Sequence, residues 1–240
     1  MQLSGKTILV TGGTDGIGRE LIRQLKAKGA NIITSGRNPE RVAATQAEGF
    51  EVIAADLSTP AGIDALIAGV AGRALDILVN NAGAGSDHDF REGPPDLADN
   101  DACLYLNVNA PVHLITRLMP VLRARPEAMI VNVTSGLAIA PRAGGPIYCA
   151  TKAALRSYTQ ALRVQLEGTN IHVLEALPPV VETKMTAGRG NRKMSAPDCA
   201  AAFVRAMEAN AEEANVGMVK LLKLVHSLSP ALARKIMIRF

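Results

Sequence analysis

The chain has 240 residues, of which 48% are hydrophobic and 20% charged, so it can bury a sizeable core without a disulfide or metal staple. Its net charge of +4 comes from residues 216–240, which hold five basic residues and no acidic one. Aromatic residues make up 3% and Trp is absent, which argues against nucleic-acid binding. Three widely spaced cysteines form neither a disulfide framework nor a zinc site, and no apolar run reaches the roughly 18 residues of a membrane span. The short polar N-terminus is unlike a signal peptide, so we expect a cytoplasmic protein without a metal.

Strand-like and helix-like segments alternate along the chain. In chain order, apolar runs predict strands at 7–11, 30–34, 52–55, 75–79, 129–133 and 171–177, and helical periodicity predicts helices at 16–28, 63–70, 104–123 and 148–166. The strand runs are apolar throughout, as in parallel sheets covered on both faces. Polar loops are expected at 86–101 and 186–195. The order predicts an α/β fold with one doubly wound parallel sheet, in a single domain spanning 1–240.

A glycine-rich turn joins the first strand to the first helix. It reads Thr-Gly-Gly-Thr-Asp-Gly-Ile-Gly over residues 11–18. Glycines let the backbone approach a pyrophosphate, and the helix N-terminus presents free N–H groups to it. This context favours a Rossmann-like dinucleotide site, although many strand-to-helix turns carry glycine for steric reasons alone.

Six motifs in order resemble the short-chain dehydrogenase/reductase family. The glycine spacing G-x-x-x-G-x-G is followed by Asn-Asn-Ala-Gly at 80–83, by Asn107, by Ser135, by Tyr148 and Lys152 in Y-x-x-x-K, and by a Pro-to-Thr motif at 178–183. The resemblance spans residues 5 to about 210. Segments 126–128, 133–138 and 148–155, with the double proline at 178–179, are similar to the DltE-type oxidoreductase branch. Pro179 stands where the family motif has glycine, and proline fixes φ and removes an N–H.

The resemblance implies an NAD(P)-dependent oxidoreductase acting on a carbonyl or secondary alcohol. Tyr148 and Lys152 lie four residues apart and share a helix face, so the ammonium favours the tyrosinate. The resemblance assigns the role of general acid/base to Tyr148 and the contact with the substrate oxygen to Ser135. It also implies that Asn107 holds a water that relays protons to Lys152. Asn109 is the nearest competitor for the Asn107 role, and loops 84–101 and 184–200 are expected to line the substrate pocket. The cofactor contacts implied are Gly12, Thr14, Asp15, Gly16, Ile17, Gly18, Arg37, Asp56, Leu57, Asn81, Ala82, Gly83, Tyr148, Lys152, Pro178, Val181 and Thr183.

The end of the second predicted strand bears on the choice of cofactor. NAD enzymes place an acid there, but this chain has Arg37 and no carboxylate until Glu40. An arginine can pair with a 2′-phosphate, so we expect NADP, with NAD as the alternative. Asp15 would repel that phosphate if it pointed toward it, and Asp56 is expected to contact the adenine.

The C-terminal segment 216–240 is basic and amphipathic. Met218, Leu221, Leu222, Val225 and Leu228 share one face, and Ser229 with Pro230 predicts the start of a second helix, along which Leu232, Ile236 and Phe240 continue the apolar stripe. Such a tail either packs on the protein or a second subunit, or lies on an anionic membrane surface. The family implies a homodimer or homotetramer. Two functions without turnover stay open: a dinucleotide-binding regulator and a membrane-surface interaction protein.

Overall fold

A computed structural model describes residues 1–188 and 193–239 of the chain. Seven parallel strands form one sheet in the order β3-β2-β1-β4-β5-β6-β7. Their bounds are β1 Thr7–Val10, β2 Asn31–Gly36, β3 Glu51–Ala54, β4 Ile77–Asn80, β5 Ala128–Val133, β6 Ile171–Leu177 and β7 Glu213–Asn215. The strand order reverses beside β1, which places a crevice at the carboxyl ends of β1 and β4. The predicted doubly wound parallel sheet is confirmed.

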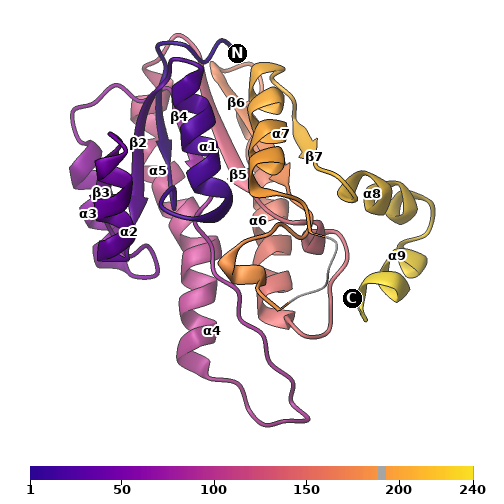
Figure 1. Cartoon of the computed structure of the whole chain (residues 1–240). Coiled ribbons are helices and arrows are strands. Elements are labelled where there is room, and N and C mark those ends of the chain that lie inside the picture. The colour runs from indigo at the N-terminus through magenta and orange to yellow at the C-terminus, as the bar shows by residue number, and fades with distance from the viewer. Residues whose placement is uncertain (189–192, 240) are drawn as a thin grey trace.

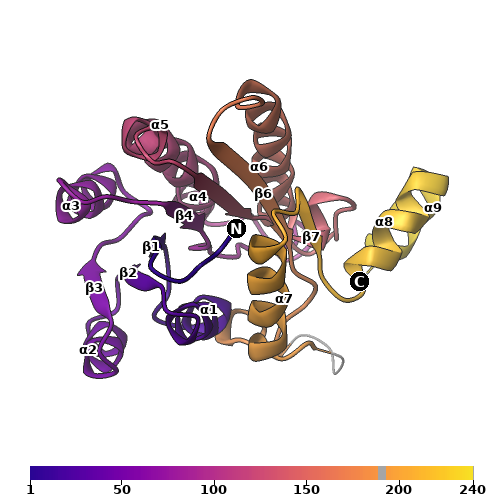
Figure 2. The same ribbon diagram turned by 90° about the horizontal axis from the view of Figure 1, so that it is seen from above.

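Helices cover both faces of the sheet, as the view from above shows (Figure 2). α1 (Gly16–Ala27), α2 (Pro39–Ala47) and α7 (Ala196–Glu208) lie on one face, and α3 (Pro60–Val70), α5 (Ala110–Arg123) and α6 (Pro146–Gln165) lie on the other (Figures 1 and 2). Successive residues of a strand point to opposite faces of the sheet, so they contribute to two separate hydrophobic cores. Ile8 and Val10 of β1 pack toward Leu21 and Phe203, whereas Leu9 packs toward the opposite face with Leu114. Burial on both sides explains why the strand runs are continuously apolar.

Side-chain caps fix where several helices begin. Asp15 accepts a hydrogen bond from the N–H of Gly16 at the start of α1, and Thr59 accepts one from Gly62 at the start of α3. The Thr59 cap places the first residue of α3 at Pro60, three residues before the predicted start. Asn38 caps α2 through the N–H of Arg41, and sequence periodicity gave no sign of this short helix.

The structure corrects several expected boundaries. α4 (Leu97–Leu104) occupies part of the expected 86–101 loop, because Asp96 caps it by accepting from the N–H of Ala98. A π-helical turn, η1 (Tyr105–Asn109), joins α4 to α5, so the predicted 104–123 helix starts earlier and is not α-helical throughout. Strand β7 and helix α7 were also not expected, and β7 is only three residues long without a β-branched side chain. Part of the expected 186–195 loop, residues 189–192, lies outside the described residues.

The C-terminal segment forms two helices that stand beside the sheet as a hairpin (Figure 1). α8 spans Val219–Leu228 and α9 spans Pro230–Met237. Ser229 caps α9 by accepting from the N–H of Leu232, and Pro230 occupies the first turn, as predicted. Phe240, the last residue of the predicted apolar stripe, lies outside the described residues. Within the described chain, no helix is both long and apolar enough to cross a membrane.

Candidate active site

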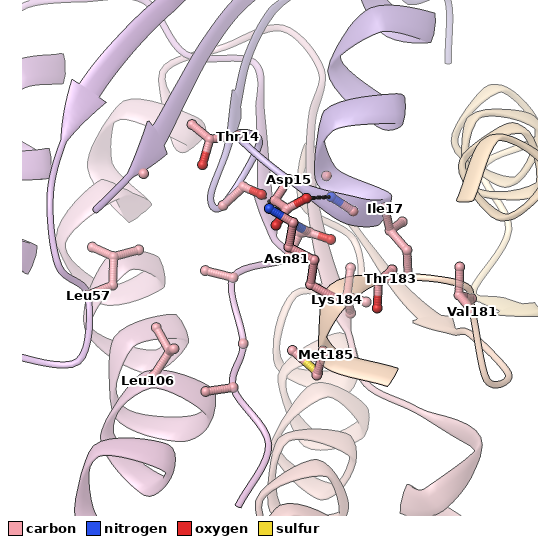
Figure 3. A pocket seen from close by; sticks show the side chains of 18 of the residues that line it. Thr14, Asp15, Ile17, Leu57, Asn81, Leu106, Val181, Thr183, Lys184 and Met185 are labelled. Carbon is pink, nitrogen blue, oxygen red and sulfur yellow. Dashed lines mark hydrogen bonds between the residues drawn. The ribbon is translucent and has the colours of Figure 1, made fainter. Parts of the chain in front are cut away.

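A cavity of about 350 Å³ runs along the carboxyl ends of the central strands (Figure 3). The structure brings together here every residue expected to contact a cofactor. They are Gly12, Thr14, Asp15, Gly16, Ile17, Gly18, Arg37, Asp56, Leu57, Asn81, Ala82, Gly83, Tyr148, Lys152, Pro178, Val181 and Thr183. They come from segments up to 171 positions apart, from Gly12 to Thr183, and we call this space the cofactor cavity.

Two glycines of the glycine-rich turn, Gly12 and Gly18, lie where a side chain would clash. Gly12 has a φ of 69°, and a Cβ there would lie 3.0 Å from the Cα of Ala82. A Cβ on Gly18 would lie 2.3 Å from the carbonyl oxygen of Gly12. The N-terminus of α1 therefore opens directly onto the cavity, where its dipole and N–H groups favour an anion (Figure 3). This cradle fits the pyrophosphate of a dinucleotide.

Hydrogen bonds hold the end of β4 against this turn. The Oγ1 of Thr11 accepts from the N–H groups of Asn81 and Ala82 at 3.0 and 2.9 Å. The side-chain amide of Asn81 donates to the carbonyl oxygen of Thr11 at 2.9 Å. The Asn-Asn-Ala-Gly segment is thus one rigid wall of the cofactor cavity.

Charged side chains form the rim of the cavity beyond β2. The guanidinium of Arg37 lies 3.4 Å from a carboxylate oxygen of Asp56. Partial burial opposes ionisation of Asp56, but hydrogen bonds from Ser58 and the charge of Arg37 outweigh it and lower its pKa. A second arginine, Arg41 in α2, lines the same rim and forms an ion pair with Asp15 at 2.8 Å. Sequence reasoning missed Arg41, whose only signal was its position four residues after Arg37.

Tyr148 and Lys152 occupy successive turns of α6 at the inner end of the cavity. The Nζ of Lys152 lies 5.7 Å from the centroid of the Tyr148 ring. It also donates to the carbonyl oxygen of Val133 at 2.9 Å. The side chain is only 4% exposed, and this burial lowers the pKa of Lys152 to about 8.

Asn107 lies behind the cavity rather than on its surface. Its Nδ2 donates to the carbonyl oxygen of Ala84 at 2.9 Å and to the Oγ1 of Thr151 at 3.0 Å, while its Oδ1 accepts from the N–H of Ala84. A Cβ on Gly83 would lie 3.1 Å from this Oδ1 and 3.5 Å from the Nζ of Lys152. The π-helical turn therefore directs Asn107 toward Lys152, whereas Asn109 is exposed.

Ser135 follows β5 and begins the short 3₁₀ turn η2 (Gly136–Ala138), accepting from the N–H of Leu137 at 3.1 Å. Ser135, Tyr148 and Pro178 line the cofactor cavity and also a second, larger cavity of about 670 Å³. Helices α8 and α9 form much of its wall. The two cavities therefore meet at Ser135 and Tyr148.

The expected substrate loops contribute unequally to these cavities. Met185 and Thr186 line both, but of the described 84–101 segment only Ala84 lines one, the cofactor cavity. The expectation that loop 84–101 lines the substrate pocket is therefore wrong for the described cavities. The second cavity is walled instead by α8 and α9, whose amphipathic pattern was visible in the sequence but whose location was not.

The segment after β6 keeps its place despite the second proline. The carbonyl oxygen of Pro178 accepts from the N–H of Gly136 at 3.1 Å. Thr183 begins the turn η3 (Lys184–Thr186), and its N–H donates to the Oγ1 of Thr186 at 3.2 Å. Thr183 lines the cofactor cavity opposite the glycine turn, so Pro179 does not displace it (Figure 3).

The described residues contain neither a cluster of metal-ligating side chains nor a disulfide. No group of three or more His, Cys, Asp or Glu residues in the described chain is placed to hold a metal ion. Cys103, Cys149 and Cys199 are buried free thiols. Burial raises the pKa of Cys149, the thiol next to Tyr148, which disfavours the thiolate.

Comparisons with known proteins agree with this geometry. The model of the short chain dehydrogenase family matches residues 6–193. An uncharacterized oxidoreductase, DltE of Bacillus subtilis, is 41% identical over 187 residues, covering 76% of this chain and 74% of that protein. A serine 3-dehydrogenase of Rhizobium radiobacter is 33% identical over 196 residues, covering 79% of this chain and 78% of that protein.

Solved structures share the whole fold. A short chain dehydrogenase from Burkholderia cenocepacia, in complex with NADP, superposes with a TM-score of 0.88 at 22% identity and covers 99% of both chains. L-sorbose reductase from Gluconobacter frateurii, complexed with NADPH and L-sorbose, has a TM-score of 0.77 at 28% identity and covers 89% of this chain and 95% of that one. On its motifs, its sheet and these matches, the chain belongs to the short-chain dehydrogenase family.

Proposed function

We propose that this protein is an NADP-preferring oxidoreductase that interconverts a carbonyl compound and a secondary alcohol, with Tyr148 as the general acid/base. The observation that carries the proposal is the junction of two cavities at Ser135 and Tyr148. One cavity has the glycine cradle and helix N-terminus of a dinucleotide site, and the other is open to a second molecule. A substrate carbonyl at the junction would meet both side chains at once.

The chemistry divides between the cofactor and the chain. The bound nicotinamide supplies a hydride to the carbonyl carbon, and the carbonyl oxygen takes up a proton. Ser135 offers a hydroxyl hydrogen bond to that oxygen, and the Tyr148 phenol donates the proton. In its protonated form, the buried Lys152 ammonium favours the tyrosinate left behind. Asn107, whose Oδ1 borders the same space beside Gly83 as the Nζ of Lys152, is proposed as the positioning residue for the proton supply.

The preference for NADP rests on the rim beyond β2. Arg37 stands where an acid would accept from a ribose 2′-hydroxyl, and Arg41 adds a second cation nearby. Arg41 also pairs with Asp15, which counters the repulsion that this carboxylate would exert on a phosphate. The solved relative at 28% identity carries NADPH, whereas a 27% identical 3-ketoacyl-(acyl-carrier-protein) reductase of Brucella melitensis carries NADH. NAD therefore stays the alternative cofactor.

A screen of ketones and secondary alcohols with both cofactors, followed at the nicotinamide absorbance, tests the proposal. L-serine belongs in the panel because of the serine 3-dehydrogenase relative. We expect turnover with at least one ketone, and faster with NADPH than with NADH. Binding of NADPH without turnover of any carbonyl or alcohol would favour a regulator that keeps the fold but not the reaction.

For the assembly, we propose that residues 1–240 form one domain with 216–240 as its basic C-terminal tail, and that the protein is a homodimer or homotetramer. The support is the family's use of its two long helices as an interface, which correspond here to α5 and α6. The side chain of Val164 in α6 is 65% exposed, consistent with a face that a second subunit would cover. Light scattering tests this, and a monomeric mass would contradict it.

A further inference from the structure

We infer that the substrate carries a bulky apolar group, and that the α8–α9 hairpin is the wall that selects it. The inference rests on the proposed function and names its substrate class. The second cavity, which we call the apolar cavity, begins at Ser135 and Tyr148 and has a volume of about 670 Å³. Pockets of this size enclose drug-sized ligands rather than two- or three-carbon substrates.

The lining of the apolar cavity excludes a polar substrate body. The hairpin supplies Met218, Val219, Leu221, Leu222, Val225 and Ile236. Beyond the catalytic end at Ser135 and Tyr148, Thr186 is the remaining hydroxyl among its described lining residues. A hydroxyl-rich or zwitterionic substrate body would lose its hydration here without gaining partners, whereas a hydrocarbon group gains from burial.

Arg142 is the charged residue among the described lining; Asp87 balances its charge, and its buried Nε has no hydrogen-bond partner in the described structure. Its guanidinium forms an ion pair with Asp87, and its side chain is 13% exposed. The positions of Gly144 and Gly145 confine it, because a Cβ on either would lie within 2.9 Å of a guanidinium nitrogen. The Asp87 pair leaves no net charge for an anionic substrate, and the free Nε donor can meet at most one polar atom, so the apolar remainder of the cavity favours a neutral apolar group.

The α8–α9 hairpin contacts the rest of the protein at both of its ends, on either side of the apolar cavity. At one end, Val219 is buried against η2, where a Cβ on Gly136 would lie 3.0 Å from its Cγ2. Lys223 forms an ion pair with Glu213 of β7. At the other end, the carbonyl oxygen of Ile238 accepts from the N–H of Ala143 at 2.9 Å. These contacts hold the hairpin at a distance that leaves the apolar cavity between them.

The absence of Trp from the chain allows a direct binding test. Leu221 and Leu224 are both on α8 and are 51% and 56% exposed, but only Leu221 lines the apolar cavity. We expect 2-decanol to shift the emission of Leu221→Trp to shorter wavelengths in a saturable way in the cofactor-free protein. It should leave the matched Leu224→Trp unchanged, and 2-butanol at equal concentration should shift neither. No shift in Leu221→Trp, or the same shift in both variants, would overturn the inference.

Kinetics with a homologous series provides the second test. With NADPH, kcat/KM should rise about two- to fourfold per added methylene from 2-butanone to 2-decanone, because each methylene is transferred from water into the apolar cavity. Leu224→Trp, which lies outside the apolar cavity, should keep this dependence. A kcat/KM that stays constant or falls with chain length would contradict the inferred substrate class but not the proposed function. Saturable 2-decanol binding without any turnover would contradict the proposed function instead.

Discussion

Arg41 and Asp15 form an ion pair at 2.8 Å, although one lies in α2 and the other at the first turn of α1. Asp15 also caps α1 through the N–H of Gly16, so its carboxylate has two partners on the rim of the cofactor cavity. Arg37 is paired with Asp56 at the longer distance of 3.4 Å, and its side chain is 61% exposed, so it is the cation more available to a 2′-phosphate.

Replacing Arg37 should therefore change cofactor preference. In Arg37→Asp, a carboxylate would repel the 2′-phosphate and accept from a 2′-hydroxyl, so the ratio of kcat/KM for NADPH to that for NADH should fall roughly 100-fold. Arg41→Ala should lower it by about tenfold at most, because Arg41 is shared with Asp15. Arg73→Asp, on the surface and outside the cofactor cavity, is the control. If the NADPH-to-NADH ratio of kcat/KM is unchanged in Arg37→Asp, Arg37 does not select the cofactor.

Tyr148→Phe should remove the proton donor and little else. We expect kcat to fall about 10³-fold, within the range of general acid catalysis, while the Kd for NADPH stays within about twofold. Tyr158→Phe is the matched control, because Tyr158 lies on the same helix but packs against the core formed with α3 and α5. Comparable turnover in Tyr148→Phe and the wild type would defeat the assignment.

Asn107→Ala should affect stability as well as turnover. The buried amide makes hydrogen bonds to Ala84 and Thr151, so its loss should lower the free energy of unfolding by about 2 kcal/mol in urea titrations. Asn109→Ala removes the same side chain from an exposed position of the same turn, so it should lower neither the free energy of unfolding nor kcat. Equal effects at the two positions would show that Asn107 has no special place beside Lys152.

Lys152 should make stability depend on alkaline pH. Its folded pKa is about 8, below the ordinary value of 10.5, so the unfolded chain holds more protons between these values. The cost of burying the ammonium is present below pH 8 and is relieved as the pH rises toward 10.5. Relative to Lys152→Met, the cofactor-free wild type should gain about 3 kcal/mol of unfolding free energy over this window. Parallel stability curves for the two proteins would show that the pKa is not lowered.

Deleting residues 217–240 should lower Tm while preserving cofactor binding. The deletion removes the buried side chains of Val219 and Ala233, but the described lining of the cofactor cavity ends at Thr186. The Kd for NADPH should therefore stay within about twofold. An unchanged Tm, with loss of cosedimentation with anionic vesicles, would favour instead a membrane-surface role for Leu224, Leu228 and Leu232, which are exposed on the hairpin.

The sequence by itself determined the parallel sheet, and its resemblance to the short-chain dehydrogenase family implied the residues gathered in the cofactor cavity. Both depend on local patterns: apolar runs for strands buried on two faces, and motifs that fall just after strands β1, β4, β5 and β6. The carboxyl ends of parallel strands meet at one edge, so residues as far apart as Gly12 and Thr183 come together once the sheet is known. The spacing of Tyr148 and Lys152 likewise predicted that the two side chains share one face of a helix, here α6.

Only the tertiary structure decided the details that depend on distant partners. The pairing of Arg41 with Asp15 needs α2 to pack beside the glycine turn, and no local pattern encodes it. The lowered pKa of Lys152 arises because the fold buries its ammonium away from water. The amphipathic pattern of residues 216–240 predicted helices but not what their apolar face meets. That part of this face walls a cavity at Ser135 and Tyr148 follows from contacts with Gly136 and Ala143, which are remote in sequence.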